Sequence, residues 1–214
     1  MDAMRDWNEL LGDAPVLPVV AVDDPERAVA VSRALHAGGL RCVELTLRTD
    51  NALACIERVA AQVPEVVLGV GTVTRASEVA AVVAAGAHFL VSPGLTPALA
   101  EALRACPVPA LPGVATPSEA LAARDWGFSA VKVFPASVLG GPAFLRALGA
   151  VTGSLGLCPT GGVGPDTLAD YLGCPKVFAA GASWPCKGEL IAEARWGEVT
   201  RRARILAERA REVL

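Results

Sequence analysis

The sequence repeats one pattern from end to end: a short apolar run rich in β-branched residues, a turn, and then an alanine-rich amphipathic stretch. Eight such units follow one another, and this periodicity predicts strands that alternate with helices. The predicted strands are Val16–Val22, Cys42–Arg48, Val66–Val73, Phe89–Ser92, Ala110–Pro112, Ala130–Phe134, Leu155–Thr160 and Val177–Gly181. Helices are predicted to begin near Pro25, Asp50, Arg75, Thr96, Pro117, Pro142 and Pro165, and a last one runs from Ile191 to Leu214.

Strands that alternate with helices indicate a parallel sheet whose faces the helices cover. Eight units fit a closed (β/α)8 barrel, the TIM barrel, and we expect a short helix before its first strand. Within the 214 residues no linker or change of composition divides the chain, which predicts one domain over residues 1–214. An open doubly wound sheet is the alternative, but Gly69-Val70-Gly71 lacks the third glycine of a dinucleotide fingerprint and opens no helix.

Composition excludes several classes of partner. The net charge is −3 without a basic cluster, which argues against nucleic acid and anionic membranes. No apolar run reaches the roughly 20 residues of a membrane helix, and the N-terminus lacks the apolar segment of a signal peptide. The six cysteines form no C-x-x-C pair, which is typical of reduced thiols in a soluble cytoplasmic protein. The two histidines, His36 and His88, belong to no cluster of metal ligands, so we expect no metal cofactor.

Lys132 stands in the apolar run from Ala130 to Ala136. The chain has three lysines against sixteen arginines, so it uses arginine where only a surface cation is needed. Burial disfavours the charged form of an amine, and a neutral amine can attack a carbonyl group, which arginine cannot do. The alternative is a partly exposed lysine on an edge strand, with its stem lying along the sheet.

Polar residues gather at the predicted ends of the second and third strands. Period-two alternation places Glu44, Thr46 and Arg48 on one face, opposite the aliphatic residues. An acid and a guanidinium inside a barrel often mark a site, although a purely structural Glu–Arg ion pair is an alternative. The third strand ends at Gly71-Thr72, where small residues leave room for a ligand; Thr72 could instead cap a helix.

The last two strands end in glycine-rich turns, Thr160-Gly161-Gly162 and Gly181-Ala182-Ser183. Barrels frequently bind phosphate at the loops after these strands, although the glycines could serve only to make tight turns. A buried amine, an acid, an arginine and a phosphate site around one pocket predict aldolase chemistry on a phosphorylated 2-oxo acid.

At these residues the chain closely resembles the bacterial 2-keto-3-deoxy-6-phosphogluconate (KDPG) aldolases, which often also act as 4-hydroxy-2-oxoglutarate (KHG) aldolases. The likeness spans almost the whole sequence. It covers the motifs Val16-Leu17-Pro18-Val19, Glu44-Leu45-Thr46-Leu47-Arg48-Thr49, Gly69-Val70-Gly71-Thr72-Val73, Ser92-Pro93-Gly94, Leu111-Pro112-Gly113-Val114, Val131-Lys132-Val133-Phe134-Pro135-Ala136, Pro159-Thr160-Gly161-Gly162 and Gly181-Ala182-Ser183-Trp184.

The resemblance implies a role for each of these site residues. Lys132 would form the Schiff base, and Glu44 would be the acid and base. The implied substrate-binding residues are Arg48 and Thr72 at the pyruvyl carboxylate, Phe134 and Pro93 along the pocket, and Thr160, Gly161, Gly162, Gly181 and Ser183 toward the distal hydroxyls and phosphate.

The family is typically a metal-independent homotrimer of (β/α)8 barrels. Its usual reaction, the last step of the Entner–Doudoroff pathway, gives pyruvate and glyceraldehyde 3-phosphate; the KHG reaction gives pyruvate and glyoxylate. Ser137 stands where many members carry an acid, and Ala182 where many carry glycine. Three alternatives stay open: an aldolase for another 2-keto-3-deoxy sugar acid, such as the galactonate epimer, a phosphate-binding barrel isomerase or epimerase, and a catalytically silent sugar-phosphate-binding protein.

Overall fold

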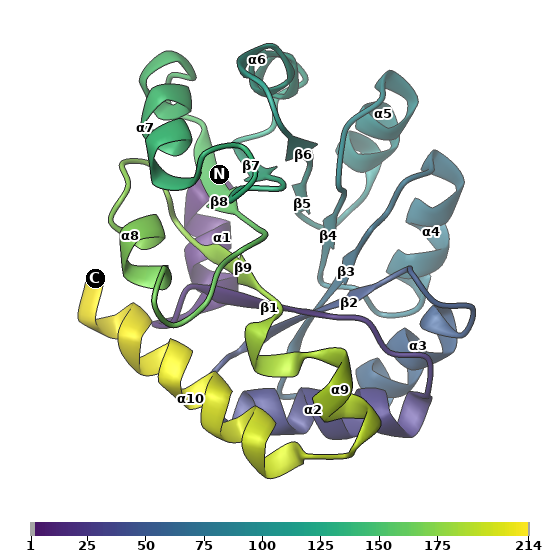
Figure 1. Cartoon of the computed structure of the whole chain (residues 1–214). Coiled ribbons are helices and arrows are strands. Elements are labelled where there is room, and N and C mark those ends of the chain that lie inside the picture. Colours follow the sequence, from purple (N-terminus) through teal and green to yellow (C-terminus); the bar gives the residue numbers. More distant parts are fainter. Residues whose placement is uncertain (1–2, 214) are drawn as a thin grey trace.

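The computed structural model describes residues 3–213, in which helices surround a set of parallel strands (Figure 1). The strands are β1 (Val16–Val20), β2 (Cys42–Thr46), β3 (Val67–Gly71), β4 (Phe89–Val91), β5 (Ala110–Leu111), β6 (Gly113–Val114), β7 (Ala130–Val133), β8 (Gly156–Pro159) and β9 (Ala180–Ala182). The helices are α1 (Ala3–Leu11), α2 (Pro25–Ala37), α3 (Ala52–Gln62), α4 (Ala76–Ala84), α5 (Pro97–Ala105), α6 (Pro117–Asp125), α7 (Gly141–Val151), α8 (Leu168–Leu172), α9 (Gly188–Ala192) and α10 (Trp196–Val213), with a 3-10 turn, η1, at Trp184–Cys186. The predicted alternation of strands and helices is confirmed.

The strands form two curled parallel sheets. One has the order β5-β4-β3-β2-β1-β9 and the other β6-β7-β8. Two isolated parallel bridges, Leu157 to Val177 and Thr160 to Gly181, connect β8 to the β9 segment. Neighbours in the sheet are also neighbours in sequence, except that the first strand pairs with the last, and this order differs from that of a doubly wound sheet.

The strands end one or two residues from their predicted ends, and three differences are larger. The fifth strand is split into β5 and β6 around Pro112, because proline has no N–H to donate to a strand ladder. The eighth strand begins at Ala180 rather than Val177, where only a single bridge forms. The last predicted helix is two helices, α9 and α10, and Ala194 between them has a left-handed backbone with φ of 52°. Its predicted end at Leu214 lies outside the described residues.

Local signals explain where several helices begin. The Asp24 side chain accepts a hydrogen bond from the Arg27 N–H at the start of α2, and proline occupies its first turn. Thr116 and Glu119 form a capping box at the start of α6. Helices α2 and α6 therefore start shortly after β1 and β6 end, and because the strands are parallel such βα loops lie at one end of the sheets.

Strand side chains alternate between two apolar regions. Val43 and Leu45 belong to the cluster between strands and helices, whereas Cys42 belongs to the cluster inside the curled sheets. Residue Glu44, between Val43 and Leu45, therefore faces the interior.

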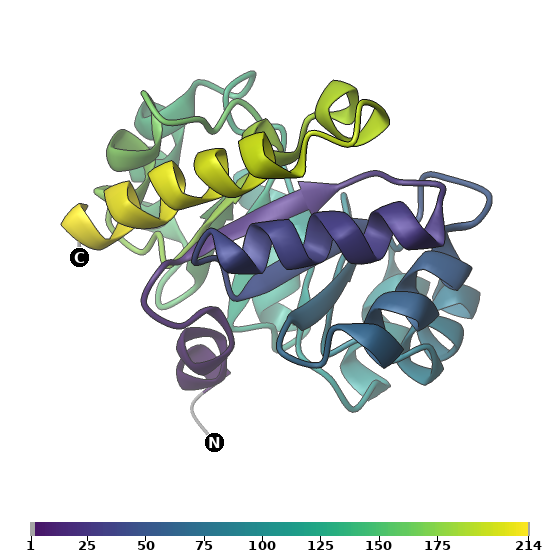
Figure 2. The ribbon, with the colours of Figure 1, turned by 90° about the horizontal axis from the view of Figure 1, so that it is seen from below.

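Helix α1 closes one end of this interior. Its Trp7 packs edge-on against Phe89, with ring centroids 5.6 Å apart, and lies 5.9 Å from the ring of Phe178. The view from below separates α1 from the outer helices and shows α10 beside α2 (Figure 2). Gly38 permits that close approach, because a Cβ there would lie 2.4 Å from the side chain of Ala203. Among the described helices, none combines the length and apolarity needed to cross a membrane.

Candidate active site

Lys132 and Glu44 form an ion pair inside the curled sheets. The Lys132 Nζ lies 3.4 Å from Glu44 Oε1, and the two side chains are 3% and 0% exposed. Strand β7 brings Lys132 from its place between β6 and β8, so the alternative of an exposed edge-strand lysine is wrong. Taking both charges out of water is unfavourable unless they are paired, so each side chain holds the other in place.

The Glu44 carboxylate fits because residue 71 is glycine. A Cβ on Gly71 would lie 1.9 Å from Glu44 Oε1. The second oxygen, Glu44 Oε2, is buried and has no hydrogen-bond partner within the described residues. A buried carboxylate oxygen without a donor is unusual, and it leaves this atom free to exchange a proton with a bound molecule.

The strand neighbours of Lys132 shape the rest of the interior. The Phe134 ring centroid lies 5.4 Å from Lys132 Nζ, on the face that alternation predicts. Gly113 pairs with Lys132 on one side, and its Cα lies against Pro93: a Cβ there would be 2.2 Å from the Pro93 backbone. Cys158 is the partner on the other side. Of the two predicted pocket residues, Phe134 thus lies near the amine, and Pro93 lies beside the strand neighbour of Lys132.

Arg48 and Thr72 meet at the mouth of the interior. The Arg48 Nε donates a hydrogen bond of 3.0 Å to Thr72 Oγ1. Because Arg48 is exposed and Glu44 pairs with Lys132, the alternative of a buried Glu–Arg ion pair is wrong. Thr72 has a left-handed backbone with φ of 59°, and Arg75 occupies the cap of α4, so the helix-cap alternative is also wrong.

Seven predicted residues line one cavity of about 120 Å³, together with Val19 and Val163: Arg48, Phe134, Thr160, Gly161, Gly162, Gly181 and Ser183. Backbone geometry explains two of its glycines. Gly161 and Gly162 have φ values of 101° and 77°, which L side chains rarely adopt. A Cβ on Gly181 would lie 2.3 Å from Thr160 Oγ1, so this glycine makes room for the threonine hydroxyl.

The thiols near the site are buried and protonated. Burial raises the pKa of Cys158 to about 12, although the Lys132 charge opposes the shift. Burial raises the pKa of Cys186 to about 12 as well, and its Sγ lies 3.4 Å from the carbonyl oxygen of Val19. Cys158 and Cys186 therefore act as small, largely apolar side chains that pack around the site.

Sequence reasoning missed the packing role of Cys158 and the true role of Gly71. Cys158 could have been found from strand period, because its position in β8 matches that of Lys132 in β7. The room left by Gly71 was expected to serve a ligand, whereas the Glu44 side chain occupies it. Among the side chains that the structure describes, no three of His, Cys, Asp or Glu are grouped to hold a metal ion, and His88 accepts a hydrogen bond from the Leu68 N–H.

Comparison with known proteins gives consistent matches. The sequence model of the KDPG and KHG aldolase family matches residues 8–202. A 2-dehydro-3-deoxy-phosphogluconate aldolase of Pseudoalteromonas atlantica is 38% identical, over 92% of this chain and 91% of that protein. A KHG/KDPG aldolase of Escherichia coli is 37% identical, over 97% of this chain and 100% of that protein.

Solved structures agree with the sequence comparisons. KDPG aldolase from Legionella pneumophila, with pyruvate captured at low pH as a covalent carbinolamine intermediate, superposes with a TM-score of 0.90. It is 34% identical and covers 94% of this chain and 98% of its own. The aldolase of Zymomonas mobilis with 3-phosphoglycerate gives 0.89 at 35% identity, and 99% of each chain is covered.

Proposed function

We propose, from the premise that this chain belongs to the KDPG and KHG aldolase family, that Lys132 and Glu44 carry out its carbon–carbon bond cleavage. The enzyme is a lyase, a Schiff-base aldolase that splits KDPG into pyruvate and glyceraldehyde 3-phosphate. Relatives named for both substrates extend the proposal to KHG, which would give pyruvate and glyoxylate. The observation that carries the assignment of residues is the buried pair itself, with an amine 3.4 Å from a carboxylate.

The first steps form the imine. A proton passes from the Lys132 ammonium to Glu44, and because the transfer stays within the buried pair its net charge remains zero. The neutral amine attacks the C2 carbonyl of the substrate and gives a carbinolamine. Glu44 then returns a proton to the departing hydroxyl, so that water leaves and a protonated imine remains.

The imine draws electrons from the bond that breaks. Glu44 accepts the proton of the C4 hydroxyl, the C3–C4 bond breaks, and its electron pair moves into an enamine while the aldehyde departs. A proton returns to C3, and water then adds to the imine carbon and releases pyruvate and the free amine. Glu44 Oε2 suits these transfers because it is buried without another hydrogen-bond partner in the described chain.

The two ends of the substrate would be held by different groups. Arg48 suits the pyruvyl carboxylate, since a guanidinium binds carboxylates through two parallel hydrogen bonds, and Thr72 orients it at 3.0 Å. Thr160, Gly161, Gly162, Gly181 and Ser183 line the same cavity and would hold the distal hydroxyls and phosphate. Phe134 lines this cavity 5.4 Å from the Lys132 amine and would exclude water from the imine, and the family resemblance gives Pro93 the same role.

We also propose that the strands close into a barrel and that the protein assembles as a homotrimer. The pairing of β1 with β9 and the bridges from β8 support closure of the strands into an eight-stranded barrel. The family resemblance supports a metal-independent cytoplasmic homotrimer. Sedimentation equilibrium would test the trimer.

Borohydride trapping tests the role of Lys132. Reduction in the presence of pyruvate is expected to inactivate the enzyme and leave a reduced pyruvyl adduct on the peptide that contains Lys132. Lys132→Arg and Lys132→Met are expected to fold and to give neither adduct nor cleavage, while Lys176→Arg retains both. An adduct on another lysine would overturn the assignment. A barrel isomerase or a silent binding protein predicts no adduct at all.

A further inference from the structure

We propose that Lys187 sets the preference of this enzyme for a substrate with a dianionic phosphate terminus. The inference rests on the proposed function and adds a residue to its distal end. Lys187 lies directly after η1, four residues beyond Ser183. It is exposed, so its side chain can reach toward a ligand at the mouth of the site.

Lys187 borders a cavity that continues the active site outward. This outer cavity has a volume of about 330 Å³, and its wall includes Trp184 and Lys187. It shares Gly162, Val163 and Ser183 with the inner cavity that contains Arg48. A substrate whose phosphate lies at the glycine turn would therefore project that phosphate toward Lys187.

Among the described residues, none pairs with the charge of Lys187. Of the three lysines, Lys132 pairs with Glu44 and Lys176 donates to the carbonyl oxygen of Gly149. Within residues 3–213 the Lys187 ammonium makes no hydrogen bond or ion pair. Asp166 also borders the outer cavity, but it pairs with Arg209 at 3.5 Å. An anion that enters this cavity would meet the free positive charge of Lys187.

Backbone donors at the shared wall complement this charge. The N–H groups of Gly162 and Val163 have no acceptor within the described chain. Successive N–H groups in a turn with positive φ form a concave site for anions. Phosphate oxygens could accept from these donors while the ammonium balances the second negative charge.

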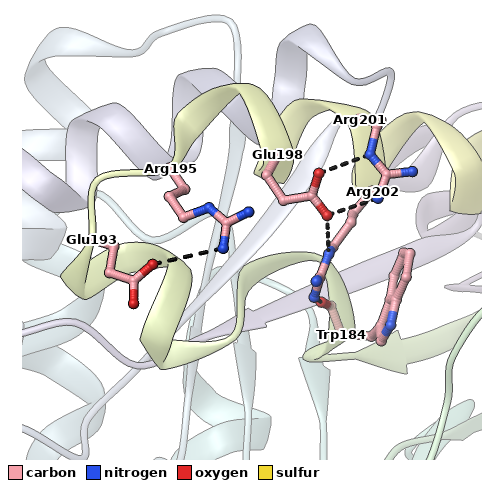
Figure 3. A network of polar contacts seen from close by, with 6 residues as sticks. All are labelled: Trp184, Glu193, Arg195, Glu198, Arg201 and Arg202. Carbon is pink, nitrogen blue, oxygen red and sulfur yellow. Dashed lines mark hydrogen bonds and ion pairs between the residues drawn. The ribbon is translucent and has the colours of Figure 1, made fainter.

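Helix α10 fixes the segment that carries Lys187 (Figure 3). The Arg202 guanidinium lies 5.0 Å from the Trp184 ring centroid, and its Nη1 donates to the Trp184 carbonyl oxygen at 3.3 Å. Glu198 holds Arg202 in turn, because Oε1 accepts from Arg202 Nε at 2.7 Å. The backbone at η1 is therefore anchored, and only the Lys187 side chain has to adapt to the ligand.

The test compares KDPG with unphosphorylated 2-keto-3-deoxygluconate in steady-state kinetics. For Lys187→Gln we expect kcat/KM for KDPG to fall about three- to fivefold, mostly through KM, as for an exposed charge pair. The kcat/KM for the unphosphorylated substrate should stay unchanged, and the Lys187→Arg variant should keep the wild-type preference for KDPG. Lys176→Gln is the matched control, and it removes the same charge far from the site without changing the preference.

Two results would overturn the inference while leaving the proposed function intact: equal losses for both substrates, or no loss for KDPG. In either case pyruvate trapping on Lys132 would proceed in Lys187→Gln as in the wild type. Failure of the wild type to trap pyruvate would instead count against the proposed function. Added salt should weaken the wild-type preference and leave that of Lys187→Gln unchanged, because only the former includes the charge.

Discussion

The Glu44 carboxylate occupies the space beside Gly71 that any side chain at residue 71 would need. Its Oε1 lies only 1.9 Å from the position that a Cβ on Gly71 would take. The glycine lies in β3 and the acid in β2, so two neighbouring strands define where the proposed proton carrier, Glu44, lies. The Lys132 amine, 3.4 Å from the same oxygen, depends on this arrangement.

Gly71→Ala is therefore expected to displace the Glu44 carboxylate. We expect kcat to fall about 100-fold, the size of effect of a misplaced general acid or base. Overpacking should also lower the free energy of unfolding by about 1–3 kcal/mol. Turnover and urea unfolding would measure the two effects. Gly197→Ala is the control, because a Cβ there meets nothing within 4 Å, and comparable losses in that variant would contradict the steric argument.

Glu44→Gln removes the proton carrier but keeps its shape. We expect kcat to fall about 100-fold or more, because each proton transfer loses its acid or base. Pyruvate should still be trapped on Lys132, at a lower rate, since the amine remains in place. Single-turnover trapping by mass spectrometry would follow this. Wild-type turnover in Glu44→Gln would exclude Glu44 as the proton carrier.

Thiol reactivity should follow burial. Burial raises the pKa of Cys42, Cys158 and Cys186 to about 12, so these thiols stay protonated at neutral pH. Cys106 is the one partly exposed thiol of the six. Native protein treated with a thiol reagent at pH 8 should react first at Cys106, and denatured protein at all six positions. Rapid native labelling of Cys158, located by peptide mapping, would contradict the closed interior.

Acid should weaken the ion pairs that Glu198 makes with Arg201 and Arg202 on α10. Hydrogen bonds from Arg201 and Arg202 lower the pKa of Glu198 from 4.5 to about 2. A lowered pKa contributes stability above the unfolded value, and that contribution is lost as pH falls from about 4.5 toward 2. The difference in unfolding free energy between wild type and Glu198→Gln should therefore shrink over this window in urea titrations. Glu193→Gln, whose partner Arg195 is 3.7 Å away, should show a smaller change, and a constant difference for Glu198→Gln would refute the linkage.

Strand period located the interior residues because side chains in a strand alternate strictly between two faces. It placed Glu44 on the face of β2 opposite the aliphatic residues and Phe134 on the face of Lys132, and both positions agree with the structure. Strand period could not show that Glu44 would pair with Lys132 rather than with Arg48. Glu44 and Lys132 are 88 residues apart in the sequence, and only the curl of the sheets brings them together.

Boundaries were harder to predict for backbone reasons. The predicted fifth strand ended at Pro112, so β6 beyond this proline was missed, and the left-handed Ala194 interrupts a helix that composition favoured. The exposure of Arg48 was also missed, since alternation gives a side chain's direction but not its depth in the interior.

Trp7 packs on Phe89 and Phe178 and closes the interior at the end that α1 covers, whereas the substrate cavity lies at the end that carries the βα loops. The pyruvyl half of the substrate would be tethered to Lys132 in the depth, whereas the aldehyde half would lie beside exposed Ser183 near the exit. We therefore expect the two products to leave the enzyme in a fixed order, the aldehyde first and pyruvate second. Product-inhibition patterns would reveal that order, and in the synthetic direction we expect pyruvate to form its imine on Lys132 before the aldehyde binds.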